Sequence, residues 1–276
     1  MFQRIQIVKI LLIDRDEASS NQIALRLQSM GYEVMVETSR EAALQMVGKQ
    51  DFKIVIADPA PLREPRQFFT ALRNASKSYP YIIMLNHDEP ENILKAGANK
   101  FLNKPADPTV LEKTILEATD LLQLRGKLSD LKTDYPSERG IISKSAFNQI
   151  FLSCVERADR HGEPTYCLFI RVENHRQLSA DSPDAAKLAT AKLAHQLSAT
   201  RRQSDILGQL DEAEYAVLFL LISSEGEPRE ATLRFVDNLS AAKGFKDRPE
   251  LDVIINLRLV ELPSGATLLN KSFSAN

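Results

Sequence analysis

The stretch Ile10–Asp16 reads ILLIDRD, a continuous apolar run followed at once by two carboxylates that flank an arginine. A short apolar run bounded by polar residues indicates a buried strand. A helical pattern follows, with Ile23, Leu27 and Met30 on one face, and it ends at Gly31. This part of the chain therefore predicts a strand, an acidic loop and a helix in succession.

The same alternation continues to about residue 122. Four more strands are predicted, at Val34–Val36, Ile54–Ala57, Tyr81–Leu85 and Phe101–Leu102, with helical segments between them. Strict alternation of strand and helix predicts a doubly wound α/β domain with a parallel five-stranded sheet and helices on both faces. We assign residues 1–122 to this domain. In such sheets, functional groups collect at the carboxyl ends of the strands.

Those strand ends carry Asp14, Asp16, Asp58, Asn86 and Lys104. With them, this segment resembles a response-regulator receiver domain, and Gly97–Phe101 matches the family's turn and switch-aromatic region. The resemblance implies that Asp58 accepts a phosphoryl group from a histidine kinase and that Lys104 neutralises it. It also implies Mg²⁺ at Asp14 and Asp58, since Mg²⁺ needs hard oxygen ligands beside the phosphoryl oxygens.

Two positions depart from the family pattern. The family has a pair of acidic residues after the first strand, whereas Arg15 stands second here and Asp16 lies one residue further on. The Ser or Thr that follows strand four is Asn86, whose amide still donates a hydrogen bond. Two interpretations stay open. Asp58 is phosphorylated, or the domain is a receiver-shaped module that is never phosphorylated, with Arg15 paired to Asp58 in imitation of a neutralised site.

A helical connector is predicted over residues 108–135, overlapping the last helix of the first domain. Its leucines step by three, four and three, at Leu121, Leu124, Leu128 and Leu131. This heptad-like stripe is suited to pairing with a second chain, so we expect a homodimer. The alternative is that the helix packs on its own domain. Residues 133–139, with Pro136, indicate a break between domains.

A second domain is predicted over residues 138–276, with helices and strands in a different order. Helices are expected at Lys144–His161, Pro183–Thr200 and Arg229–Lys243, strands at Tyr166–Val172 and Leu251–Val260, and a hairpin at Asp205–Leu210 and Tyr215–Ile222. This order resembles the α+β fold of GGDEF (diguanylate cyclase) domains, with a mixed or antiparallel sheet. That family joins two GTP molecules with the help of Mg²⁺.

The residues that such catalysis needs are replaced. The resemblance aligns the first metal-binding aspartate with Arg171, the two signature glycines with Asp211 and Glu212, and the metal-binding signature acid with Ala213. Side chains at the glycine positions would crowd and repel a triphosphate. The family's closing helix is also expected to be absent, because the sequence ends at Asn276. We therefore expect a degenerate domain without catalytic residues, and no enzyme.

One regulatory motif of that family is intact. Arg202 and Asp205 stand three apart, five residues before the altered signature, and Arg201 adds a second cation. The resemblance implies that the pair binds cyclic di-GMP, since Arg suits phosphate or a guanine edge and Asp accepts from guanine. The alternative is that Asp205 only caps the turn before the next strand.

Composition narrows the class of function. The 276 residues are 43% hydrophobic and 26% charged, with a net charge of -2, so nucleic acid is not an expected partner. Neither cysteine has metal or redox spacing, which favours the cytoplasm, and the apolar run Val8–Ile13 is too short to cross a membrane. We expect a two-component signalling phosphoprotein that binds a partner protein. The alternatives are an unregulated dimeric scaffold and a weak diguanylate cyclase.

Overall fold

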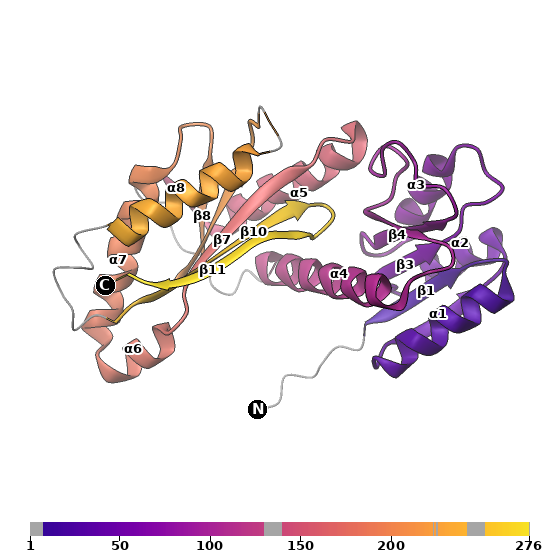
Figure 1. The fold of residues 1–276 in the computed structure, drawn as a ribbon, viewed down its shortest axis with the longest axis horizontal. Helices are drawn as coiled ribbons and strands as arrows, with labels where there is room; N and C mark the ends of the chain where they lie inside the picture. The colour runs from indigo at the N-terminus through magenta and orange to yellow at the C-terminus, as the bar shows by residue number, and fades with distance from the viewer. Residues whose placement is uncertain (1–7, 130–139, 223, 225, 242–251, 276) are drawn as a thin grey trace. The chain divides into compact units, whose positions relative to one another are not determined.

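The computed structural model describes residues 8–129, 140–222, 224, 226–241 and 252–275. The chain divides into two compact units. One unit comprises residues 1–124 with 157–163, and the other comprises 125–156 with 164–276. Figure 1 shows the two sheets on which the units are built.

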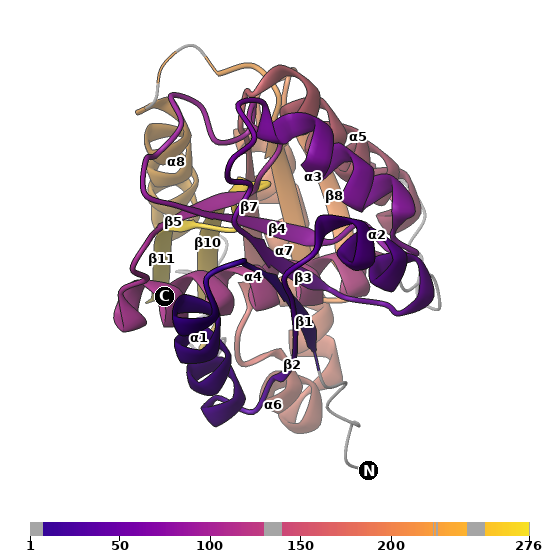
Figure 2. The same cartoon turned by 90° about the vertical axis from the view of Figure 1, so that its right-hand side faces the viewer.

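The first unit holds a five-stranded sheet in which every neighbouring pair is parallel. Its order is β2-β1-β3-β4-β5, with bounds Glu33–Glu37, Lys9–Ile13, Ile54–Ala57, Tyr81–Asn86 and Lys100–Asn103. The predicted receiver-like fold is therefore confirmed. Because the order reverses next to β1, the ends of β1 and β3 lie side by side at the carboxyl edge (Figure 2).

Helices pack on this sheet through alternating strand residues. Helices α2 (Arg40–Lys49) and α3 (Pro65–Ala75) share a buried cluster with Leu11, Val55 and Ile82. Helix α1 (Glu17–Ser29) also belongs to this unit, as does α4 (Pro108–Ser129) as far as Leu124. Ile10 and Leu12 alternate with Leu11 along β1 and are also fully buried, so the sheet is covered on both faces.

The connection between β4 and β5 differs from the predicted strict alternation. Residues 87–99 form turns and bends instead of a helix. The amide of Ala96 bonds to the carbonyl of Asn92, and Gly97 then takes a φ of 91°. A single helical turn thus fits between Pro90 and Gly97, and a left-handed residue ends it. The buried Asn99 that follows accepts the amide of Ile82 at 2.8 Å.

Three leucines of the connector stripe are buried. Leu121, Leu124 and Leu128 are 3%, 9% and 1% exposed. The pairing of this stripe with a second chain stays a prediction, as does the alternative in which the helix packs on its own domain. Leu131 and the predicted break at residues 133–139 lie outside the described residues.

The second unit holds a six-stranded mixed sheet of order β11-β10-β7-β9-β8-β6. Its bounds in that order are Thr267–Ser274, Ile254–Leu262, Thr165–Val172, Glu214–Phe219, Ile206–Asp211 and Ile141–Ile142. All neighbouring pairs are antiparallel except β6 with β8, which confirms the predicted mixed sheet.

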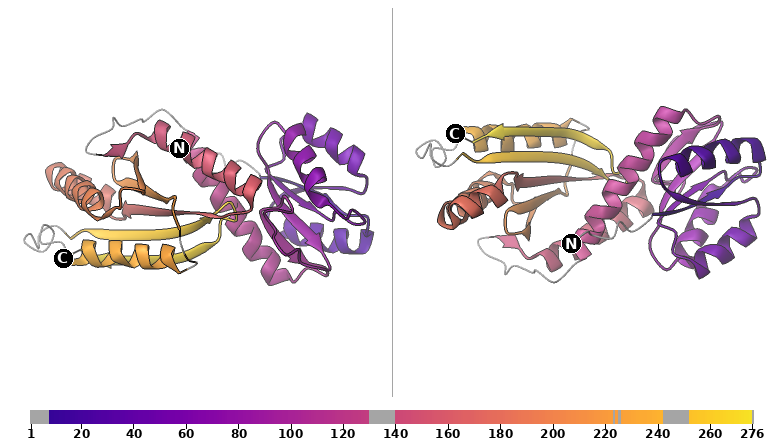
Figure 3. Two further views of the ribbon diagram at one scale, coloured as in Figure 1. Left: turned by 90° about the horizontal axis from the view of Figure 1, so that it is seen from above. Right: turned by 90° about the horizontal axis from the view of Figure 1, so that it is seen from below.

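Helices lie on both faces of this second sheet (Figure 3). Helices α7 (Pro183–Thr200) and α8 (Glu227–Ala241) share a buried cluster with the strand residues Leu168, Val217 and Leu257. On the opposite face, Phe147 of α5 (Lys144–His161) packs so closely on Gly208 of β8 that an added Cβ would lie 2.5 Å from the ring. A short helix, α6 (His175–Asp181), precedes α7.

Among the described residues of this unit, three elements were not predicted: β6, α6 and β11. Strand β6 has two residues, and β11 is an edge strand that lacks regular alternation of apolar and polar residues. The predicted ends of the third helix at Lys243 and of the last strand at Leu251 lie outside the described residues. Within the described part of the chain, no helix is both long enough and apolar enough to span a bilayer.

Candidate functional site

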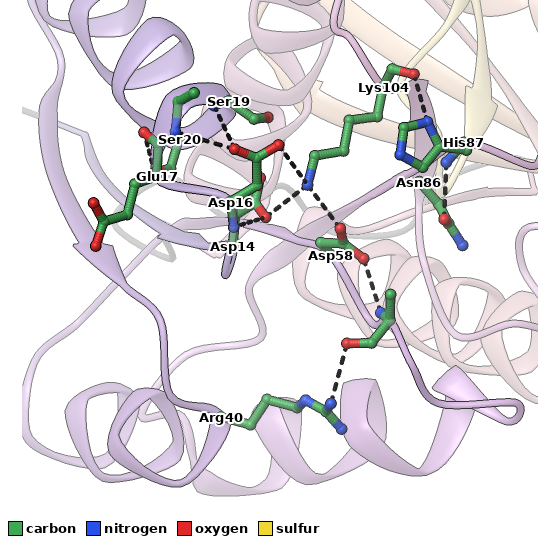
Figure 4. A network of polar contacts seen from close by, with 12 residues as sticks. Asp14, Asp16, Glu17, Ser19, Ser20, Arg40, Asp58, Asn86, His87 and Lys104 are labelled. Carbon is green, nitrogen blue, oxygen red and sulfur yellow. Dashed lines mark hydrogen bonds and ion pairs between the residues drawn. The ribbon is translucent and has the colours of Figure 1, made fainter.

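An ammonium and two carboxylates meet at the carboxyl edge of the first sheet (Figure 4). Asp14 follows β1, Asp58 follows β3 and Lys104 follows β5. Lys104 Nζ lies 2.7 Å from Asp14 Oδ1 and 2.8 Å from Asp58 Oδ2. The sequence placed these three residues at one edge, and the structure brings them into one hydrogen-bonded group.

This group is largely withdrawn from solvent. The side chains of Asp14, Lys104 and Asp58 are 1%, 6% and 12% exposed. Burial acts to lower the pKa of Lys104, but the hydrogen bonds and negative charges of Asp14 and Asp58 outweigh it and raise that pKa above its ordinary value. Lys104 is therefore charged at neutral pH and holds two carboxylates together.

Two carboxylates, those of Asp14 and Asp58, are the oxygen donors at this edge of the sheet. Asp14 Oδ1 accepts from Lys104 and from the amide of Asp16, whereas Asp14 Oδ2 is buried without a hydrogen-bond partner. Asp58 Oδ1 accepts the amide of Ala60 at 2.8 Å. Among the described residues, no group of three or more His, Cys, Asp or Glu side chains could hold a metal ion. Mg²⁺ commonly binds through one or two carboxylates plus phosphate oxygens and water, which matches Asp14 and Asp58.

The other predicted residues of this site take different roles. The carboxylate of Asp16 caps α1 by accepting the amides of Ala18 and Ser19, and its second oxygen lies 4.0 Å from Lys104 Nζ. Arg15 is exposed, and the cation paired with Asp58 is Lys104. The hypothesised pairing of Arg15 with Asp58 is therefore wrong, because the buried lysine already occupies that position.

The end of β4 contributes two neighbouring residues. Asn86 Oδ1 accepts the amide of His87 at 2.8 Å, which leaves the Asn86 side-chain amide as a donor. The His87 ring lies with Nδ1 2.9 Å from the carbonyl oxygen of Lys104. No pattern in the sequence assigns His87 a role, since it sits at no metal-ligand spacing and its contact partner is seventeen residues away.

In the second unit, the side chains of Asp205, Arg202 and Arg201 each contact nearby groups of the protein. Asp205 Oδ2 accepts the backbone amide of Arg202 at 2.9 Å, as the turn-capping alternative predicts. The Arg202 guanidinium pairs with Glu227 of α8 and is half exposed. The Arg201 guanidinium donates to the carbonyls of Arg202 and Asp205 at 3.4 and 3.3 Å.

A third arginine, missed in the sequence, belongs to the same region. Arg234 of α8 is among the cations whose charge acts on the carboxyl of Asp205. Its Nε and one terminal nitrogen are buried without a hydrogen-bond partner. Burial of Asp205 raises the pKa of its carboxyl despite the charges of Arg234, Arg202 and Arg201. No spacing in the sequence links Arg234 to residue 205.

The hairpin of β8 and β9 forms as predicted, with Asp211 paired to Glu214 across its tight turn. Arg171, near the end of β7, is exposed and forms an ion pair with Glu173 at 3.4 Å. Glu214 pairs with Lys127. Arg171 and Glu214 are thus each paired with an oppositely charged side chain.

Comparisons with known proteins agree with this geometry for the first unit. Residues 10–116 match the family model described as response regulator receiver domain. The chain is 29% identical over 118 residues to the transcriptional regulatory proteins GlrR of Escherichia coli K12 and QseF of Escherichia coli O157:H7. The match covers 40% of this chain and 26% of each relative, so the chain spans about a quarter of the curated relatives it matches.

Solved structures give matches of similar extent. Chemotaxis response regulator CheY4 of Vibrio cholerae is 28% identical, with a TM-score of 0.37, over 41% of this chain and 99% of CheY4. The GGDEF domain of PA1120 from Pseudomonas aeruginosa is 16% identical, with a TM-score of 0.36, over 43% of this chain and 74% of that domain. From the family match and the site geometry, residues 10–116 are a response regulator receiver domain of two-component signal transduction, joined to a second α/β domain.

Proposed function

We propose that this chain is a non-catalytic signalling protein in which phosphorylation of Asp58 governs how the second domain engages a partner protein. The observation that carries this proposal is the bridge from Lys104 to both Asp14 and Asp58. A carboxylate beside a fixed ammonium is prepared for a group that brings additional negative charge.

The chemistry follows from the contacts of Asp58. A carboxylate oxygen of Asp58 attacks the phosphorus of a phosphohistidine on a kinase, or of acetyl phosphate. The bond from phosphorus to the donor breaks, and an acyl phosphate forms on Asp58. Lys104 would neutralise the phosphoryl oxygens and the side-chain amide of Asn86 would donate to one of them. Mg²⁺, when bound by Asp14 and Asp58, supplies further charge neutralisation.

Small-molecule phosphotransfer tests this proposal. The protein is incubated with acetyl phosphate and Mg²⁺, and its intact mass is recorded beside that of Asp58→Asn. We expect a single phosphoryl adduct on the unaltered protein and none on the variant. An unmodified protein, or an adduct that persists in Asp58→Asn, would favour the alternative in which the receiver is an unregulated scaffold.

For the second domain we propose binding without catalysis. This rests on the exposed Arg171 at the strand end where the resemblance implies a metal-binding aspartate. It also rests on Asp211 and Glu212, whose side chains stand where glycines would admit phosphates. Incubation with GTP and Mg²⁺ should give no cyclic di-GMP. Product that forms with wild-type protein and is lost in Glu214→Ala would instead support the weak cyclase.

A second candidate function is control by cyclic di-GMP at Arg202, Asp205 and Arg201. The observation that favours it is the gathering of Arg201, Arg202 and Arg234 around one carboxylate, with buried Arg234 nitrogens that have no hydrogen-bond partner. Such a cluster suits a phosphate diester, because guanidinium groups bind phosphate in a bidentate manner. A ligand would have to displace Glu227 from Arg202, which is half exposed and accessible.

Calorimetry separates this candidate from a relic motif. Cyclic di-GMP is titrated into the unaltered protein and into Arg202→Ala. Binding that is lost in Arg202→Ala supports the site, whereas no heat with unaltered protein sinks it. Arg176→Ala, an exposed arginine on α6, is the matched control and should leave binding unchanged.

A further inference from the structure

We propose that His87 is a positioning residue for Lys104, because its ring holds the carbonyl of Lys104 while the ammonium of the same residue reaches Asp14 and Asp58. The proposal rests on the proposed phosphorylation of Asp58 and adds a residue to that site. Figure 4 shows the His87 ring on one side of Lys104 and the carboxylates on the other.

The direction of the hydrogen bond is fixed by its partner. The Lys104 carbonyl oxygen can only accept, so the Nδ1 atom of His87, 2.9 Å away, must carry the proton. Both the neutral Nδ1–H tautomer and the imidazolium supply that donor.

The backbone of Lys104 is held at both of its polar groups. Its amide donates to the carbonyl of Asn86 at 2.9 Å, which extends the pairing of β4 with β5 by one bond. Pro105 comes next and has no amide hydrogen with which to extend that ladder. The His87 ring donates to the Lys104 carbonyl at this point, and Asn86 Oδ1 fixes the amide of His87 itself.

The geometry matters because of the reach of a lysine side chain. Four rotatable bonds separate the Lys104 backbone from the ammonium, and ordering them costs rotamer entropy. A fixed backbone at Lys104 limits the positions that its ammonium can sample. Misplacement of a charged group by about 1 Å weakens phosphoryl transfer, in which catalysis is mostly positioning and electrostatics.

The test compares three substitutions. His87→Phe keeps a ring without a donor, and His87→Asn places an amide nitrogen at the same distance along the side chain as Nδ1. His195→Phe, on an exposed position of α7, is the matched control. His87 is itself exposed, so these changes should leave the fold intact. The readout is the rate of Asp58 phosphorylation by acetyl phosphate with Mg²⁺.

We expect His87→Phe to slow phosphorylation roughly fivefold, since a net hydrogen bond is worth about 1 kcal/mol and a tenfold rate change about 1.36 kcal/mol. His87→Asn should retain most of the rate and His195→Phe all of it. In a Lys104→Ala background, His87→Phe should have no further effect. An unchanged rate in His87→Phe, an equal loss in His87→Asn, or the same loss without Lys104 would overturn the proposal.

A second readout does not depend on phosphorylation. The ammonium signal of Lys104 in proton–nitrogen NMR spectra, identified by its absence in Lys104→Ala, reports whether the ammonium is held. At fixed pH, we expect to observe the Lys104 ammonium signal in unaltered protein and in His87→Asn. We expect the signal to be weakened or lost in His87→Phe. If unaltered protein accepts no phosphoryl group, the proposed function fails, while this signal still decides the role of His87.

Discussion

Lys104 Nζ lies 2.7 Å from Asp14 Oδ1, on a carboxylate whose other oxygen is buried without a hydrogen-bond partner. A buried carboxylate with one bonded and one open oxygen is costly unless a cation stays beside it. Lys104 supplies that cation and also bonds Asp58. The receiver site is thus held together by one lysine.

Lys104→Met should destabilise the receiver by roughly 3–5 kcal/mol, because removing one partner of a buried ion pair leaves the other uncompensated. Denaturant unfolding followed by circular dichroism measures this change. The control is Lys9→Met, which removes an exposed pair with Glu33 and should cost no more than about 1 kcal/mol. Equal effects of the two substitutions would show that the buried bridge contributes no special stability.

The same bridge predicts a pH dependence. The pKa of Lys104 is raised in the folded protein, so its stabilising contribution is complete below the ordinary lysine value of about 10.4 and is lost as the pH rises through the folded value. The stability difference between unaltered protein and Lys104→Met should therefore be constant from neutral pH to about 9 and shrink above about 10. A gap that narrows already near neutral pH contradicts this assignment.

The contribution of Asp205 to stability should change with pH in the opposite direction to that of a carboxyl whose pKa is lowered by folding. Burial raises its pKa in the folded protein, so the folded state binds its proton more tightly and this group's contribution to stability falls as the pH rises through the usual carboxyl range. Asp205→Asn keeps an oxygen to accept the Arg202 amide and removes the charge. Unfolding at acidic and neutral pH should show the variant gaining on unaltered protein as pH rises. Asp237→Asn, exposed on α8, is the control and should show no such trend.

Gly208→Ala tests the packing of the second sheet. An added Cβ would lie 2.5 Å from Phe147 Cδ2 and 2.8 Å from its Cβ, so the helix must shift, at a cost of about 1–3 kcal/mol. Gly126→Ala, in α4 with nothing within 4 Å of the new atom, should instead stabilise by up to about 1 kcal/mol. Thermal unfolding of both variants measures the contrast, and tolerance of Gly208→Ala would refute the tight contact.

Elements with strong local signals could be predicted from the sequence. Strand β3 has the predicted bounds, since four apolar residues precede an aspartate, and α7 begins at Pro183, which favours a first helical position. The prediction of a helix between β4 and β5 was wrong because the helical pattern there ends at Gly97. The two-residue β6 exists only through pairing with β8, which local sequence does not encode.

The residues of the candidate site also divide into those that could be predicted from the sequence and those that could not. Asp14, Asp58 and Lys104 could be predicted, because parallel strands carry their carboxyl ends to one edge. The contacts of His87 and Arg234 could not, since each joins segments that only the folded chain brings together. Arg15 misled for a related reason: its side chain is exposed, although its neighbour in sequence is the buried Asp14.

Location of a phosphoryl group on Asp58 tests the central claim most directly. The protein is treated with acetyl phosphate and Mg²⁺, then with borohydride, which reduces an acyl phosphate to the alcohol, and the peptides are sequenced by mass spectrometry. We predict that homoserine forms at position 58 in unaltered protein, and that its yield is much lower in Lys104→Met. Reduction at no position, or at a carboxylate other than Asp58, would contradict it.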